Sequence, residues 1–199
     1  MPNWCNNTLS LQHEDPAMIQ RAVAAFKAGT LLNEFIPVPE SLHITASPGT
    51  TDAALKTLYE ANLAQHGYAN WYDYQVAHWG TKWDVGGDDY GDAIVSQDGM
   101  SMTVSFDSAW SPPCTAMETL MGLGFSAKLF YFEPGMCFAG IWEDGNDDYY
   151  EYGSMNSEQV AEELPVELDE MFCISESMAE YEEENQDIDL DGGLSATNE

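Results

Sequence analysis

The segment from His78 to Asp84, HWGTKWD, holds the residue types best suited to binding chemistry. Two indoles flank a Gly-Thr-Lys turn, and indoles together with a cation can clamp a planar or anionic ligand. The candidate ligand-binding residues are His78, Trp79, Lys82, Asp84 and Trp110. The alternative is structural: Trp79 and Trp83 fill the edge of the core, Lys82 pairs with Asp84, and Trp110 anchors packing.

Other residues give little support to catalysis. None of the four histidines forms an HxxxH or HExxH pair, which argues against a catalytic zinc site; they are His13, His43, His66 and His78. The sequence has no GxSxG, Walker A or GxGxxG motif. A cysteine–histidine pair would be recognised only in space. We expect a protein that is not an enzyme, with no catalytic residues and no cofactor.

Two segments approach the calcium-loop pattern, which needs alternating acids, a glycine and a final glutamate. In the segment from Asp187, position twelve is Asn198, and Glu199 comes one residue late. In the segment from Asp144, Tyr149 stands where glycine belongs. We therefore expect no specific metal site, only loose condensation of cations on the acidic tail.

The charge of the chain is very uneven. It carries 35 acidic and 5 basic residues, and Lys128 is the last basic one. The 71 residues after it hold 21 of the acids. Such a surface repels nucleic acid and membrane and attracts basic protein surfaces at long range.

The acids after residue 157 recur along predicted helices at a density comparable to, though sparser than, that of duplex DNA phosphates. We predict that they bind a basic host protein, such as one that binds nucleic acid. The partner-binding residues are Glu158, Glu162, Glu163, Glu167, Asp169, Glu170, Glu176 and Glu180. The alternative is a solvated surface that only keeps the protein soluble.

The cysteine spacing gives no finger-type or CxxC pair, because no two of Cys5, Cys114, Cys137 and Cys173 lie closer than 23 positions. No basic start followed by an apolar run is present, so we expect reduced thiols and a cytoplasmic location. No apolar stretch approaches the ~20 residues that span a bilayer.

Hydrophobic periodicity predicts the elements that would position these residues. The alternation at 3–12 predicts a strand, and Asp15-Pro16 starts a helix that Gly29 ends. Prolines predict a loop over 30–50. A second helix, with Leu55, Leu58 and Tyr59 on its apolar face, runs from 51 to Gly67.

Further along, residues 71–84 begin with a short helix that Gly80 breaks, and 86–91 form a loop. Residues 92–107 predict a hairpin with a type I′ turn at Asp98-Gly99. Thr115 and Glu118 form a capping box for a third helix, and 125–142 contain a strand pair.

This order of elements predicts an α+β fold: a ferredoxin-like split βαβ antiparallel sheet, extended by one strand, with a helical insertion over about 51–84. The helices should pack on one face of the sheet. We divide the chain into a domain over 1–145, an acidic helical extension over 146–183 and an acidic tail over 184–199. A stripe containing Leu168, Phe172 and Met178 should dock the extension.

Five motifs together resemble the YubB family, ferredoxin-like proteins of phages and plasmids of the Api type. The motifs are Met1-Pro2-Asn3-Trp4-Cys5-x-Asn7, Trp79-Gly80-Thr81-Lys82-Trp83-Asp84, Phe106-x-x-Ala109-Trp110-x-Pro112-Pro113, Phe132-Glu133-x-Gly135 and Phe138-x-Gly140. The resemblance covers about residues 1–145 and implies a ferredoxin-like fold and a mobile-element origin. It implies no activity and leaves the most acidic part of the chain uncovered.

Together these patterns predict a non-enzymatic, strongly acidic binding protein. It would engage a basic host protein, as a nucleic-acid mimic that inhibits a defence or restriction factor, and would bind no nucleic acid or membrane itself. The alternative is a small-molecule-binding protein or enzyme built around His78–Asp84 and Trp110.

Overall fold

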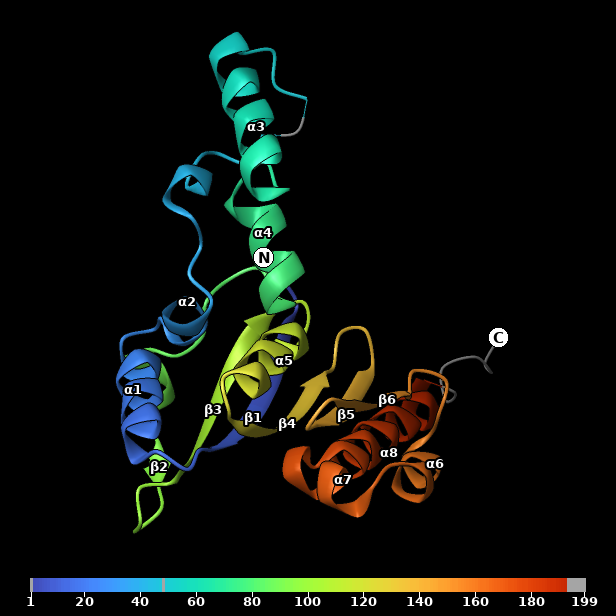
Figure 1. The fold of residues 1–199 in the computed structure, drawn as a ribbon. Helices are drawn as coiled ribbons and strands as arrows, with labels where there is room; N and C mark the ends of the chain where they lie inside the picture. The colour runs from blue at the N-terminus through green and yellow to red at the C-terminus, as the bar shows by residue number, and fades with distance from the viewer. Residues whose placement is uncertain (1, 48, 193–199) are drawn as a thin grey trace.

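The computed structural model describes residues 2–47 and 49–192, with side chains to residue 185. It is an α+β fold with one six-stranded antiparallel sheet in the order β2-β3-β1-β4-β5-β6 (Figure 1). The strands are β1 (Trp4–Gln12), β2 (Ile94–Val95), β3 (Ser101–Ala109), β4 (Ser126–Glu133), β5 (Phe138–Glu143) and β6 (Asn146–Glu151).

Helices occupy the long connection between β1 and β2, the connection between β3 and β4, and the segment after β6. The α-helices are α1 (Pro16–Lys27), α2 (Leu31–Phe35), α3 (Ala53–His66), α4 (Trp71–Trp79), α5 (Cys114–Gly122), α6 (Ser157–Glu163), α7 (Val166–Phe172) and α8 (Ile174–Gly192). Short 3-10 turns form η1 (Glu40–Leu42) and η2 (Asp88–Tyr90), the latter inside the predicted 86–91 loop.

Both faces of the sheet are covered, which corrects the expectation of helices on one face. Strand residues alternate between faces, so β4 sends Leu129 into one core and Phe130 into another. The first core includes residues of α1, α2 and α5. The second is closed by α6, α7 and α8 through Val160, Leu168 and Ile174. The second layer arises because the residues after β5 supply a further strand and an apolar helical stripe.

Local capping signals were predicted correctly. The Asp15 carboxylate accepts from Ala17 N, and Asp52 accepts from Ala54 N at the start of α3. Gly67 and Gly80 end α3 and α4 in the left-handed conformation, with φ of 78° and 82°. These contacts lie within a few residues of each other, which is why the sequence reveals them.

Three local predictions were wrong, one of a loop, one of a turn and one of a helix cap. The segment 30–50 holds α2 and η1 as well as loop. Gly99 alone of the 98–99 pair has a positive φ, so the hairpin turn is not type I′, which needs both. The helix α5 begins after Pro113 without a side-chain cap, whereas the capping box of the structure joins Asn156 and Gln159 at α6.

The C-terminal part differs from the expected helical extension over 146–183 and loose tail over 184–199. Residues 146–151 pair with β5 as β6, and their acidic side chains suit an edge strand, where charge discourages pairing with another chain. Residues 157–183 are helical as predicted, and α8 continues to Gly192. The remainder of the predicted tail lies outside the described residues.

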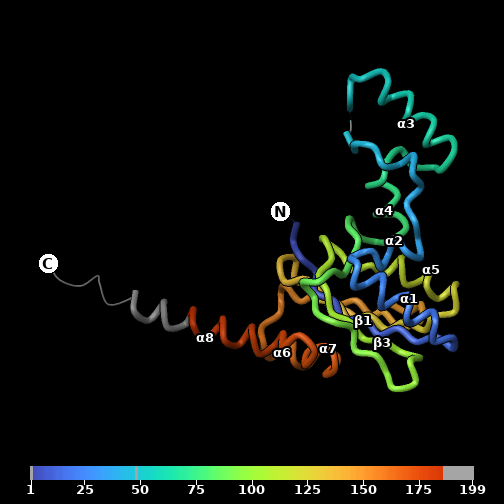
Figure 2. The backbone as a smooth tube through the Cα atoms, turned by 90° about the vertical axis from the view of Figure 1, so that its left-hand side faces the viewer, coloured from blue at the N-terminus to red at the C-terminus, as the bar shows by residue number. Residues whose placement is uncertain are grey.

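The helices α3 and α4 rise from the end of the sheet as an arm, and α8 projects from the body on another side (Figures 1 and 2). The predicted apolar face of α3 is therefore not a core face, since Leu58 is half exposed and Leu55 and Tyr59 are only partly buried. The base of the arm is anchored in the core by Trp79 of α4, and Asn62 Nδ2 on α3 donates to the carbonyls of Ser41 and Ala69.

Candidate functional site

Three segments far apart in the sequence are joined by hydrogen bonds at one end of the sheet. Trp110 N donates to Asn3 O at 2.9 Å, which ties the end of β3 to the start of β1. Ser111 Oγ donates to Gly80 O at 2.6 Å, and Thr81 Oγ1 donates to Ala109 O at 3.0 Å. The loops that follow α4 and β3 therefore form one rigid platform.

Trp79 is part of the core and not of a ligand site. Its side chain is 1% exposed, and its Nε1 donates to Ile36 O at 3.0 Å. The structural alternative is correct for this indole, because a buried indole N–H needs an acceptor and finds a backbone carbonyl.

Asp84 has a structural role that the sequence did not reveal. Its carboxylate accepts from Leu32 N at 2.7 Å, Asn33 N at 2.9 Å and Val85 N at 2.8 Å. Burial raises the pKa of Asp84, and these three backbone donors oppose the rise. Asp84 thus caps α2. The structural alternative expected it to pair with Lys82, and that expectation was wrong. The contact of Asp84 with α2 also explains why this helix was missed.

His78 points to a different neighbourhood from Lys82. Its ring lies 5.2 Å from the Tyr68 ring and 4.2 Å from the Tyr74 ring, measured between centroids. The five candidate ligand residues therefore do not converge on one site.

Lys82 is surrounded by aromatic rings. Its Nζ lies 4.6 Å from the ring centroid of Trp83, 5.1 Å from that of Trp110 and 5.9 Å from that of Tyr72. The Trp4 ring lies 5.8 Å from Trp83 and extends the cluster. Within the described part of the chain, no carboxylate lies at salt-bridge distance from this ammonium.

The three indoles of this cluster remain partly open to solvent: Trp4 is 43%, Trp83 39% and Trp110 45% exposed. Trp110 also has a φ of 71°, a conformation that a bulky residue adopts at a cost. Backbone strain of this kind concentrates at functional positions. Sequence reasoning identified Lys82 and Trp110 but missed Trp4 and Tyr72, although Trp4 stands in the first motif.

The two later motifs are explained by structure. Glu133 is fully buried, and its carboxylate accepts from the backbone N–H groups of Gly135 and Met136, which fixes the β4–β5 turn. A Cβ at Gly140 would overlap the hydroxyl of Tyr131, which donates to Asp147 at 2.7 Å.

The acidic partner-binding candidates divide into two groups. Six are exposed on the helices, and they are Glu158, Glu162, Glu163, Glu170, Glu176 and Glu180. Two have partners in the fold. Glu167 pairs with Lys128 Nζ at 3.2 Å, and Asp169 accepts from Ser175 N at 2.7 Å to cap α8.

Another acid also has a structural role that the sequence did not reveal. Glu182 on α8 accepts from the N–H and hydroxyl of Ser157, at 2.9 and 2.7 Å, and so holds the start of α6. Its partner lies 25 residues away, which places this cap beyond any local signal.

The structure gives little support to a cysteine nucleophile or a metal site in the described residues. All four cysteines are free. Burial raises the pKa of Cys5 to about 12 and raises that of Cys114 further, which opposes a thiolate nucleophile at either position. In the described residues, no group of three or more His, Cys, Asp or Glu side chains could hold a metal ion.

Of the two calcium-like segments, the one at Asp144 has a structural role, and the one at Asp187 lies partly outside the described residues. Asp144 accepts from Ser126 Oγ and Ala127 N, which ties the β5–β6 turn to β4. The backbone from Asp187 is helical to Gly192, whereas Asn198 and Glu199 lie outside the described residues. No helix of the described chain has both the length and the apolar character to cross a bilayer.

Comparison with known proteins gives one similarity. No family model and no curated protein matches the chain. A similar solved structure is the crystal structure of protein Api92 from Yersinia pseudotuberculosis, of family DUF1281, at 13% identity and a TM-score of 0.36. The match covers 78% of this chain and 99% of that one. The similarity is to an Api-type protein at low identity, and membership of the YubB family remains a prediction from the motifs.

Proposed function

We propose that this chain is a non-enzymatic binding protein whose acidic face on α6, α7 and α8 engages a basic host protein. The partner would be a protein that binds nucleic acid, such as a defence or restriction factor, and the acidic face would act as a nucleic-acid mimic that blocks it. The observation that carries the proposal is that six carboxylates are exposed on these helices, while the sequence has no lysine or arginine after Lys128.

The scarcity of basic residues supports this proposal, because three of the five are already paired with acids in the fold. Arg21 lies 2.6 Å from Glu34, Lys27 lies 3.4 Å from Asp92, and Lys128 lies between Glu143 and Glu167. Little positive charge remains to offset the acids, so the field around the molecule attracts cationic surfaces and speeds their encounter.

The test is a matched pair of charge variants. In the first, the six exposed glutamates of α6–α8 become glutamine. In the control, six exposed acids elsewhere become their amides: Glu14, Glu40, Glu60, Asp88, Asp89 and Glu118. Both variants have the same net charge, so any difference reports the position of the charge.

We expect unmodified protein and control to capture basic nucleic-acid-binding proteins from host lysate, and duplex DNA or high salt to release them. The α6–α8 variant should lose this capture. Equal capture by the two variants would contradict the proposal.

We infer further that residues 1–145 form a ferredoxin-like domain followed by an acidic extension, and that the protein acts in the host cytoplasm. The strand order β2-β3-β1-β4, with α1 and α5 as the two crossovers, supports the split βαβ arrangement.

A second candidate function is supported by the cluster around Lys82. Exposed indoles and an ammonium without a carboxylate partner suit a small planar anion. Titration with aromatic carboxylates should quench tryptophan fluorescence, and Lys82→Gln should abolish the effect. Unchanged quenching in that variant would remove this candidate.

A further inference from the structure

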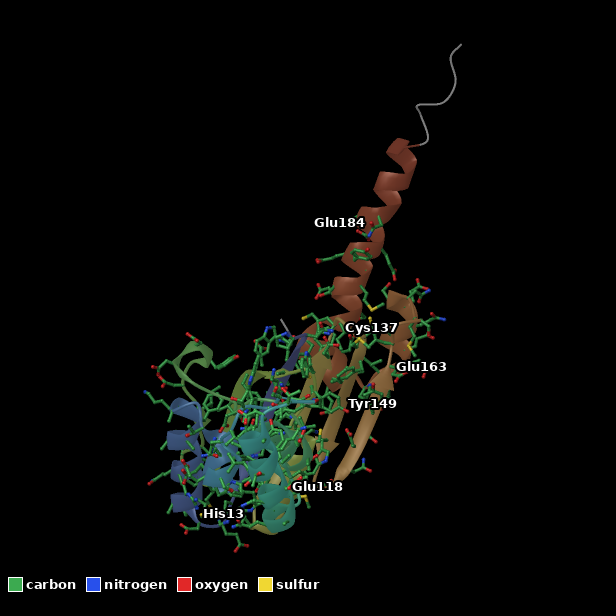
Figure 3. The ribbon with its side chains drawn as sticks, turned by 90° about the horizontal axis from the view of Figure 1, so that it is seen from above. His13, Glu118, Cys137, Tyr149, Glu163 and Glu184 are labelled. Carbon is green, nitrogen blue, oxygen red and sulfur yellow. The ribbon has the colours of Figure 1, made fainter. Side chains whose placement is uncertain are left out.

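An apolar groove of about 580 Å³ lies where α8 leaves the body. The sheet side of the groove is formed by Phe132, Cys137 and Tyr152. Phe132 stacks on Tyr152 and on Phe172, with ring centroids 6.1 and 5.5 Å apart, which makes this floor rigid. Figure 3 shows Cys137 beside the base of α8 and Glu184 on the projecting part of the helix.

One face of α8 forms the other wall. Ile174, Met178 and Tyr181 line the groove at the spacing of a single helical face. Their exposure rises along the helix, from 1% at Ile174 through half-buried Met178 to 70% at Tyr181. The apolar stripe therefore continues beyond the sheet that covers its first turn.

The charges beside this stripe have one sign. Glu184 is exposed on α8 three residues after Tyr181, which places it at the edge of the stripe, whereas Glu176 and Glu183 lie on the opposite side of the helix. Glu182 lines the groove itself but is already bonded to Ser157. An occupant must therefore present apolar side chains to the groove and positive charge to its rim.

We propose that the groove receives an amphipathic helix of the basic partner, with apolar residues at i, i+3, i+4 and i+7 flanked by lysine or arginine. This inference rests on the proposed function, which gives the sign of the partner's charge. Helix-in-groove recognition uses this spacing of anchors. A second copy of this chain fits poorly, because its own α8 would bring glutamates against glutamates.

The test compares two synthetic Leu/Lys peptides of equal composition, one in amphipathic order and one scrambled. Peptide affinity is measured by fluorescence anisotropy at low salt. In a Cys173→Ser background, the alkylation rate of Cys137 reports occupancy, because Cys5 and Cys114 are largely buried with raised pKa values.

The variant Tyr181→Ser removes the exposed anchor. The matched control is Tyr149→Ser, because Tyr149 is also exposed but packs on Phe138 at the other face of the sheet.

We expect the amphipathic peptide to bind about tenfold more tightly than the scrambled one. It alone should slow the alkylation of Cys137. Tyr181→Ser should abolish this preference and leave the scrambled peptide unaffected, whereas Tyr149→Ser should preserve both affinities.

Other outcomes overturn the inference in distinguishable ways. Equal affinity of the two peptides, or an unprotected Cys137, would exclude the groove and leave the acidic-face proposal standing. Failure of both peptides to bind at low salt would contradict both proposals. Protection of Cys137 by dimerisation alone would make a second copy the occupant.

Discussion

At the scale of single residues, the conformation of Trp110 opposes stability. Its φ of 71° suits glycine, and a non-glycine residue there costs on the order of 1 kcal/mol. We therefore expect Trp110→Gly to be more stable than Trp110→Ala by about 1 kcal/mol, because both remove the indole and only glycine relieves the strain. Urea unfolding of the two variants measures the difference. Equal stability would mean that the backbone at this position relaxes.

A second residue, Asp84, holds α2 from a distance. Asp84→Ala leaves the N–H groups of Leu32 and Asn33 without an acceptor and should destabilise the protein by about 2 kcal/mol. The control Asp92→Ala removes an exposed ion pair with Lys27 and should change stability by less than about 0.5 kcal/mol. Chemical denaturation of both variants checks this order. Similar losses of unfolding free energy in the two variants would show that the Asp84 cap does not stabilise the protein.

At the scale of elements, the pairing of β4, β5 and β6 depends on Gly140. Gly140→Ala would place a methyl group against the Tyr131 ring and the Asp148 carbonyl, so we expect a loss of about 2–3 kcal/mol. Gly122→Ala, at the end of α5, meets nothing within 4 Å and should be neutral or slightly stabilising. The measurement is the denaturation midpoint at constant m. A tolerated Gly140→Ala would mean that Tyr131 can move.

At the scale of the whole molecule, the net charge of −30 opposes the compact state. Added salt screens this repulsion, since the Debye length falls from about 30 Å at 0.01 M to about 3 Å at 1 M. We expect the melting temperature to rise by about 2–4 °C between these concentrations, equivalent to about 1 kcal/mol. Calorimetry in sodium chloride tests this. A melting temperature that falls with salt would indicate that ion pairs dominate.

The sequence by itself determined the features whose signals are local. Alternation identified β1 and β3, and a strand pair was predicted at β4 and most of β5. Asp15 and Asp52 marked helix starts because each caps a backbone group two residues away. The charge asymmetry is also read from the order of residues alone. Within the candidate site, the sequence indicated Lys82 and Trp110 as residues with binding chemistry.

Only the tertiary structure decided features that depend on distant partners. The helix α2 is capped by Asp84 from 52 residues away, and the start of α6 is held by Glu182 from 25 residues away. The same cause brings Trp4 and Tyr72 towards the rings around Lys82, and places a second core against the far face of the sheet. These contacts form between segments whose approach is set by packing, and no spacing along the chain encodes that approach.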